Sequence, residues 1–142
     1  MGAAIIGIQV WAALGRCLRD SLEGRVLSEV ARVLRPGGRF AMELNNRDWI
    51  IRNFQPASVV DRAGELMIDQ RRLEPLTGQI ISEPTVVGHG QVRRIPLFVR
   101  MFTFTELRDW LLAAGFASVH GYGADGTPWT TESPRMITIA EC

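Results

Sequence analysis

The passage from a helix into a strand between residues 20 and 44 constrains the fold of this chain most. Asp20 can cap a helix, and Glu23, three residues later, completes a capping box. Pro36 and Gly37 end the helix, since glycine suits the left-handed position that follows a helix, and an apolar strand starts at Phe40. The apolar stripe of the helix consists of Leu22, Val26, Leu27, Val30, Val33 and Leu34. This order predicts an α/β crossover unit.

An earlier strand is predicted at residues 3–10. This run is apolar throughout instead of alternating, which is typical of a strand covered on both faces in a parallel sheet. Loops at 11–15 and 45–48 follow the two strands. Since 142 residues suit one domain, we expect a single α/β domain over residues 1–142.

An antiparallel β insertion is expected at residues 55–100 of that domain, because the composition there changes to that of short strands and turns. Pro84 and Pro96 should confine parts of these strands to a sheet edge or a bulge. We therefore expect a meander added to the parallel sheet. Its expected strands are residues 65–73, 79–87 and 91–99, with turns at 75–78 and 88–90.

The last helix has the clearest boundaries. Thr103 is its expected N-cap, Glu106 completes a capping box, and Gly115 ends it. Phe102 and Leu107 stand at the positions of a hydrophobic staple. Residues 116–120 and 136–140 then predict two closing strands.

Composition excludes several classes of protein. A net charge of +1, with acidic and basic residues interspersed, does not favour a nucleic-acid partner. The apolar run at 2–14 is too short for a membrane span and lacks the basic start of a signal peptide. Cys17 and Cys142 have no metal-ligand spacing, so we expect no metal site and reduced thiols in a cytoplasmic protein.

Four stretches resemble class I S-adenosylmethionine-dependent methyltransferases that act on small molecules. The helix and strand around Pro36-Gly37-Gly38 resemble the fourth helix and fifth strand of that family. The other stretches, in the family's order, are Glu65 to Gly78, Arg100 to Phe116 and Gly121 to Ile137. The resemblance implies a partial Rossmann-like methyltransferase fold that corresponds to the C-terminal half of the family's domain.

The resemblance also implies S-adenosylmethionine as cofactor, but the glycine-rich first turn that holds it has no counterpart in the sequence. Gly121-Tyr122-Gly123-Ala124-Asp125-Gly126 spells a nucleotide-binding pattern, yet Pro128 and Pro134 follow it instead of a helix. We therefore expect the chain to be inactive alone. The alternatives are a non-catalytic remnant that dimerises or binds a partner, and a fragment with no independent role.

Candidate site residues follow from the rule that open parallel sheets bind ligands at the carboxyl ends of their strands. After the first strand these are Trp11 and Gly15, where the resemblance implies contacts with the edge of the cofactor. No catalytic residue is assigned, since His89 and His120 have no nucleophile nearby in sequence. Arg100 can hold an acidic group bidentately. The candidate substrate-binding residues are Asn45, Asn46, Asp48, Arg100 and Tyr122.

The strand at 3–10 becomes a sheet edge if the strands beyond it in the family's fold are missing. An apolar edge without lysine or proline invites pairing. We expect a homodimer or a partner chain there, with Ile5, Ile6, Ile8 and Val10 at the contact. Replacing Ile6 or Ile8 with lysine should weaken association more than folding. A monomer at high concentration in sedimentation of the unmodified chain would contradict this prediction.

Overall fold

The computed structural model describes residues 6–7 and 20–142, and these fall into two compact units. The first unit contains Ile6–Gly7 with residues 20–52 and 102–142. The second contains residues 53–101. Among the described residues, no helix is long and apolar enough to cross a membrane.

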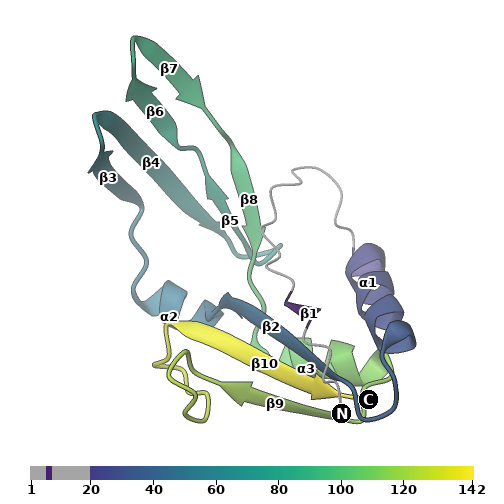
Figure 1. Cartoon of the computed structure of the whole chain (residues 1–142). Coiled ribbons are helices and arrows are strands. Elements are labelled where there is room, and N and C mark those ends of the chain that lie inside the picture. Colours follow the sequence, from purple (N-terminus) through teal and green to yellow (C-terminus); the bar gives the residue numbers. More distant parts are fainter. Residues whose placement is uncertain (1–5, 8–19) are drawn as a thin grey trace. The chain divides into compact units, whose positions relative to one another are not determined.

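The first unit is a mixed four-stranded sheet with helices (Figure 1). Its strand order is β1-β2-β10-β9, and β1 pairs parallel with β2 through Ile6↔Phe40. This pairing, with a helix between the strands, confirms the α/β crossover. The elements in chain order are β1 (Ile6–Gly7), α1 (Asp20–Val33), β2 (Arg39–Asn45), α2 (Arg47–Arg52), α3 (Phe104–Ala113), β9 (Ser118–Tyr122) and β10 (Arg135–Glu141).

Gly37 and Gly38, between α1 and β2, are each required for a different steric reason. Gly37 has a φ of 74°, in the left-handed region where a side chain is strained. At Gly38, a Cβ atom would lie 2.8 Å from the carbonyl oxygen of Arg35. The Gly37 N–H donates to the Cys142 carbonyl at 2.9 Å, which ties this turn to the end of the chain.

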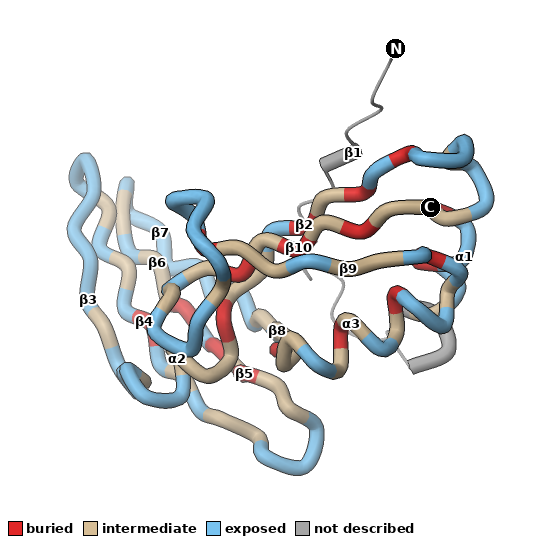
Figure 2. The backbone as a smooth tube through the Cα atoms, turned by 90° about the horizontal axis from the view of Figure 1, so that it is seen from below, coloured by how far each residue is buried: buried red, intermediate tan, exposed pale blue. Residues whose placement is uncertain are grey.

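One face of the first unit's sheet forms the core. Figure 2 shows α1 and α3 on the same side of β2, β10 and β9. The rings of Phe40 and Phe116 stack at 5.9 Å, and Leu107 and Leu111 of α3 are buried beside them. The buried cluster is Leu27, Val30, Phe40, Met42, Leu107, Leu111, Phe116, Met136 and Ala140.

The capping of α3 confirms the predicted start of this helix. The Thr103 hydroxyl accepts a hydrogen bond from the Glu106 N–H at 3.2 Å. Phe102 packs edge-on against Trp110, with ring centroids 5.5 Å apart. Gly115, with a φ of 108°, follows the last turn. This helix is therefore fixed at both ends by residues that the sequence already indicates.

The second unit is an antiparallel meander with two interrupted strands. β4 pairs with β6 and β5 in one continuous register. β6 pairs in turn with β7, and β5 with β8, again in one continuous register. β5 and β6 therefore form one interrupted strand, and β7 and β8 form the other. Pro84 and Pro96 lie at the interruptions, where each removes a backbone N–H from the ladder. The strands are β3 (Ala57–Arg62), β4 (Glu65–Glu74), β5 (Gln79–Ser82), β6 (Thr85–Gly88), β7 (Gln91–Arg94) and β8 (Leu97–Arg100).

Two tight turns close the hairpins of this meander. Ala63 and Gly64 join β3 to β4, and His89 and Gly90 join β6 to β7, all with positive φ. Such two-residue turns match the twist of antiparallel strands. β3 was not predicted from the sequence. Its residues directly follow Pro56, and the turn after it begins with Ala63, which is not a typical turn residue.

Substitutions at Leu111 and Leu112 test how α3 packs against the core. Leu111 is 0% exposed, whereas the neighbouring Leu112 is 43% exposed on the same helix. Leu111→Ala should lower the free energy of unfolding by about 2–5 kcal/mol, because it leaves a cavity. Leu112→Ala is the control and should cost less than about 1 kcal/mol. Urea denaturation measures both, and equal losses would show that α3 does not pack as described.

Candidate functional site

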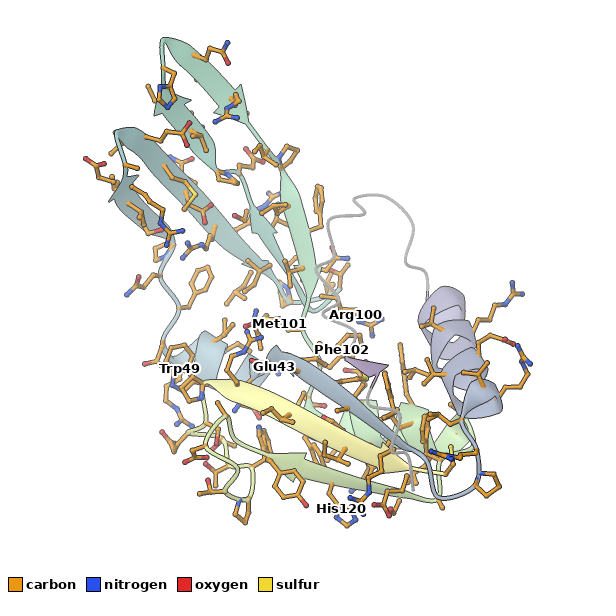
Figure 3. The ribbon with its side chains drawn as sticks, viewed as in Figure 1. Glu43, Trp49, Arg100, Met101, Phe102 and His120 are labelled. Carbon is orange, nitrogen blue, oxygen red and sulfur yellow. The ribbon has the colours of Figure 1, made fainter. Side chains whose placement is uncertain are left out.

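The second face of the first unit's sheet carries the candidate site. Residues Ala41, Glu43 and Asn45 alternate with the buried Phe40 and Met42 along β2, so they point away from the core. Direct pairing aligns Glu43 with Ile137 and Tyr122, and Ala41 with Ile139 and His120. Figure 3 labels Glu43 on β2 and His120 on β9.

Arg135 organises this face at the carboxyl end of β2. Its Nε donates to Glu43 Oε1 at 2.9 Å, and its Nη1 donates to Asn45 Oδ1. Arg135 pairs directly with Asn45 in the sheet, which brings the guanidinium to both acceptors. One cation, one carboxylate and one amide are thus held together at the strand end where parallel sheets bind ligands.

Asn46 lies on the other side of the chain and is 1% exposed. Its Nδ2 donates to the carbonyl oxygens of Thr130, at 3.1 Å, and Ser133, at 2.7 Å. Its Oδ1 accepts from the Asp48 N–H at 3.1 Å and so caps α2. These contacts make Asn46 a positioning residue that joins the end of β2 to the loop before β10. A direct contact with substrate from this side chain stays a prediction.

Asp48 lies in the first turn of α2, where a negative charge is favourable at the start of a helix. Its carboxylate is 3.9 Å from the Arg47 guanidinium, and both side chains are about one-third exposed. Asp48 is therefore available at the carboxyl end of β2, close in sequence to Asn45.

An open hollow of about 460 Å³ lies on the same face of the sheet. Tyr122 borders it, and an ion pair between Arg39 and Glu141, 2.5 Å apart, closes one end. The other lining residues are Ala41, His120 and Ile139. The hollow therefore combines small and apolar side chains with a phenol, an imidazole and a neutralised ion pair.

The remaining predicted site residues are not brought into this group. Arg100 belongs to the second unit, where it pairs with Gln79 between β8 and β5. Trp11 and Gly15, the predicted cofactor contacts, lie outside the described residues. Of the predicted set, the structure joins Asn45, Asn46, Asp48 and Tyr122 around the ends of β2 and β9.

The pattern at Gly121 to Gly126 does not form a nucleotide-binding turn. Residues Gly121 to Gly126 run from β9 into a turn, where the Gly126 N–H donates to the Gly123 carbonyl at 3.0 Å. The next regular element along the chain is the strand β10, so this turn does not lead into a helix. The hydroxyl and N–H of Thr127 both donate to Asp125 and hold the pKa of its carboxyl below the ordinary value. Asp125 therefore stabilises the loop that contains it.

Comparison with known proteins gives matches among solved structures only. No protein-family model matches the chain, and no curated protein matches it in sequence. The CcbJ methyltransferase from Streptomyces caelestis aligns with 96% of this chain and 58% of its own length, at 16% identity and a TM-score of 0.74. An S-adenosylmethionine-dependent methyltransferase from Clostridium acetobutylicum aligns with 96% of this chain and 56% of its own, at 8% identity and a TM-score of 0.74.

A third similar structure is an amino pentose methyltransferase from Micromonospora echinaspora, with S-adenosylmethionine bound. It aligns with 96% of this chain and 57% of its own length, at 16% identity and a TM-score of 0.60. At such identities the matches show the fold alone. The chain has a partial methyltransferase-like fold and spans somewhat more than half the length of these proteins.

Sequence reasoning missed Glu43 and Arg135. Glu43 appears in the sequence as an ordinary polar residue of a strand, and Arg135 as a residue after a proline. The signal that joins them is the register between β2 and β10, which places residues about ninety positions apart side by side. No local pattern in the sequence specifies that register.

The buried amide of Asn46 gives a prediction about the site's framework. Asn46→Ala leaves two carbonyls and one N–H without partners, so it should cost about 1–3 kcal/mol of stability. The Asp48 amide should also exchange its hydrogen faster. Asn45→Ala is the matched control, since that side chain is only partly buried and has one bond to Arg135. Equal effects of the two variants in denaturation and hydrogen exchange would contradict the role of Asn46.

Proposed function

We propose that this chain is the substrate-side, C-terminal part of an S-adenosylmethionine-dependent methyltransferase that acts on a small molecule. The observation that supports it best is the alignment of 96% of the chain with the fold of such an enzyme, at a TM-score of 0.74. The similar structures include an amino pentose methyltransferase and a sugar N-methyltransferase. We therefore propose a small polar acceptor that carries hydroxyl or amino groups.

In this proposal the second face of the first unit's sheet contacts the acceptor. Glu43 and Asn45 offer oxygen acceptors to hydroxyl or ammonium groups, and Arg135 holds both in place. Tyr122 and Asp48 complete the substrate side. Trp11 and Gly15 are proposed to line the edge of the cofactor.

The cofactor half of the site is proposed to come from residues outside these 142. Parallel strands are usually covered on both faces, whereas antiparallel strands such as β2, β10 and β9 can leave one face to water. Here α1 and α3 pack on one face, while the face with Ala41 and Ile139 has an open hollow. A segment that supplies the glycine-rich turn would also cover that face. We also propose that the protein is cytoplasmic, where Cys17 and Cys142 would stay reduced.

The alternative proposal is a non-catalytic remnant of a methyltransferase that binds a partner. Both proposals expect the chain alone to have no useful affinity for S-adenosylmethionine. They differ once a cofactor half is present, because the remnant would stay inactive in that complex.

Calorimetry with S-adenosylmethionine tests the first step. The purified chain should give no measurable binding heat, since its sequence has no counterpart of the glycine-rich turn that holds the cofactor. A dissociation constant near 1 μM, or about −8 kcal/mol, would overturn the expected inactivity and restore a single-chain enzyme.

The acceptor side needs an active complex. The chain should be co-expressed with any glycine-rich strand–turn–helix segment encoded just upstream of Met1. In that complex, Arg135→Met should lower kcat/KM for the acceptor by up to about 100-fold while the cofactor's dissociation constant stays unchanged, because only acceptor positioning is lost. Arg108→Met, on the exposed side of α3, is the control. An unchanged kcat/KM in Arg135→Met would exclude this face as the acceptor site.

A further inference from the structure

The second unit exposes an aliphatic patch on one face of its sheet. Directly paired residues share a face, and two rows of such pairs cross β3, β4, β6 and β7. The first row is Val59, Ile68, Thr85 and Arg94, and the second is Asp61, Leu66, Val87 and Val92. The aliphatic residues of these rows, Val59, Leu66, Ile68, Val87 and Val92, are 36–66% exposed and form what we call the aliphatic patch.

The opposite face is more covered, although Val60 there is 40% exposed. On the opposite face, Asp69 and Ser82 are buried and hydrogen-bonded to each other at 2.6 Å, and Met67 and Val86 are half-buried. Figure 2 shows the long exposed stretch along β3. A contiguous aliphatic surface on four adjacent strands is unusual for a face that stays in water.

The corners of the patch carry opposite charges. Asp61 ends the second row on β3, and Arg94 ends the first row on β7. Both side chains are exposed, and within the described part of the chain neither forms an ion pair or hydrogen bond through its side chain. Three strand spacings of about 4.8 Å and an offset of about 7 Å along the strands separate them, so at about 16 Å they do not pair within one chain.

We propose that the aliphatic patch is the contact surface between two copies of this chain. A two-fold axis in the plane of the contact, perpendicular to the line from Asp61 to Arg94, exchanges these two corners. Asp61 of each copy then meets Arg94 of the other, and the central side chains of β4 and β6 pack against their counterparts. The self-complementary charges favour a second copy over an unrelated apolar partner.

This surface differs from the strand at 3–10, and it does not depend on methyltransferase activity. It lies entirely on the second unit, which the fold joins to the first unit through residues before Ala57 and after Arg100. Burial of the five aliphatic side chains supplies the affinity, and the two ion pairs set the orientation.

Sedimentation of the purified chain at about 1–100 μM tests the proposal. This concentration range is on the order of the dissociation constants of small protein interfaces. The unmodified chain should form a dimer, and Val92→Lys should raise its dissociation constant at least about tenfold by burying a charge. Leu76→Lys is the control: Leu76 is 94% exposed in the turn between β4 and β5, outside the patch, and its replacement should leave the dimer intact.

Charge reversal distinguishes this arrangement from non-specific hydrophobic association. Asp61→Arg and Arg94→Asp should each weaken the dimer, because each places like charges opposite one another. The double variant should recover the dimer of the unmodified chain, since it restores both ion pairs in reverse. Circular dichroism checks that each variant stays folded.

Three results would overturn the proposal: a monomer throughout the concentration range, a double variant no stronger than the single ones, or dissociation by Ile8→Lys but not by Val92→Lys. The last result would assign the contact to the strand at 3–10 instead. None of these results bears on cofactor binding, so failure here leaves the proposed function standing.

Discussion

The burial of one face of β2 and β10 is the interaction on which the first unit depends. Phe40, Met42, Met136 and Ala140 alternate along these strands and meet the apolar stripes of α1 and α3. Because strand residues alternate in direction, the same packing turns Glu43, Asn45 and Arg135 to the opposite face. The core therefore fixes the candidate site without contributing a residue to it. A slip of one residue between β2 and β10 would bury the charged set, so the core also protects the register of the site.

Local signals made much of the fold predictable. The end of α1 at Gly37, the Thr103 cap and the turns at Gly78 and Gly90 each depend on the backbone preferences of a few neighbouring residues. Two parallel strands around a helix followed from the continuous apolar runs. The prolines were also informative. Pro96 lies between β7 and β8, which end the described sheet, as expected of an edge strand. Pro84 differs, because β5 and β6 have partners on both sides and their register continues past it without a bulge.

The candidate site was less predictable because it depends on contacts between distant residues. The carboxyl-end rule selected the segment after β2, but it did not distinguish adjacent asparagines. Asn45 faces Arg135, whereas Asn46 enters the interior and binds Thr130 and Ser133. Neighbouring side chains in an extended segment point in opposite directions, so identical residue types acquire different roles. Which of the two enters the interior is decided by the register of β10 and the path of the loop before it.

The two exposed sheet faces of this chain differ in physical character. The face with Arg39 and Arg135 combines polar and apolar side chains, and each of these arginines is already paired with a carboxylate. A partner gains little electrostatic energy from such neutralised groups, so this face suits a ligand or segment that matches its hydrogen bonds and its hollow. The aliphatic patch has no internal pairing for its corner charges and gains stability from losing contact with water. A small polar acceptor cannot cover four strands of valine, leucine and isoleucine, whereas a second sheet packing about 10 Å away can. The chemistry of the surfaces therefore agrees with the two proposals, recognition of a polar molecule by the first unit and association between chains through the second.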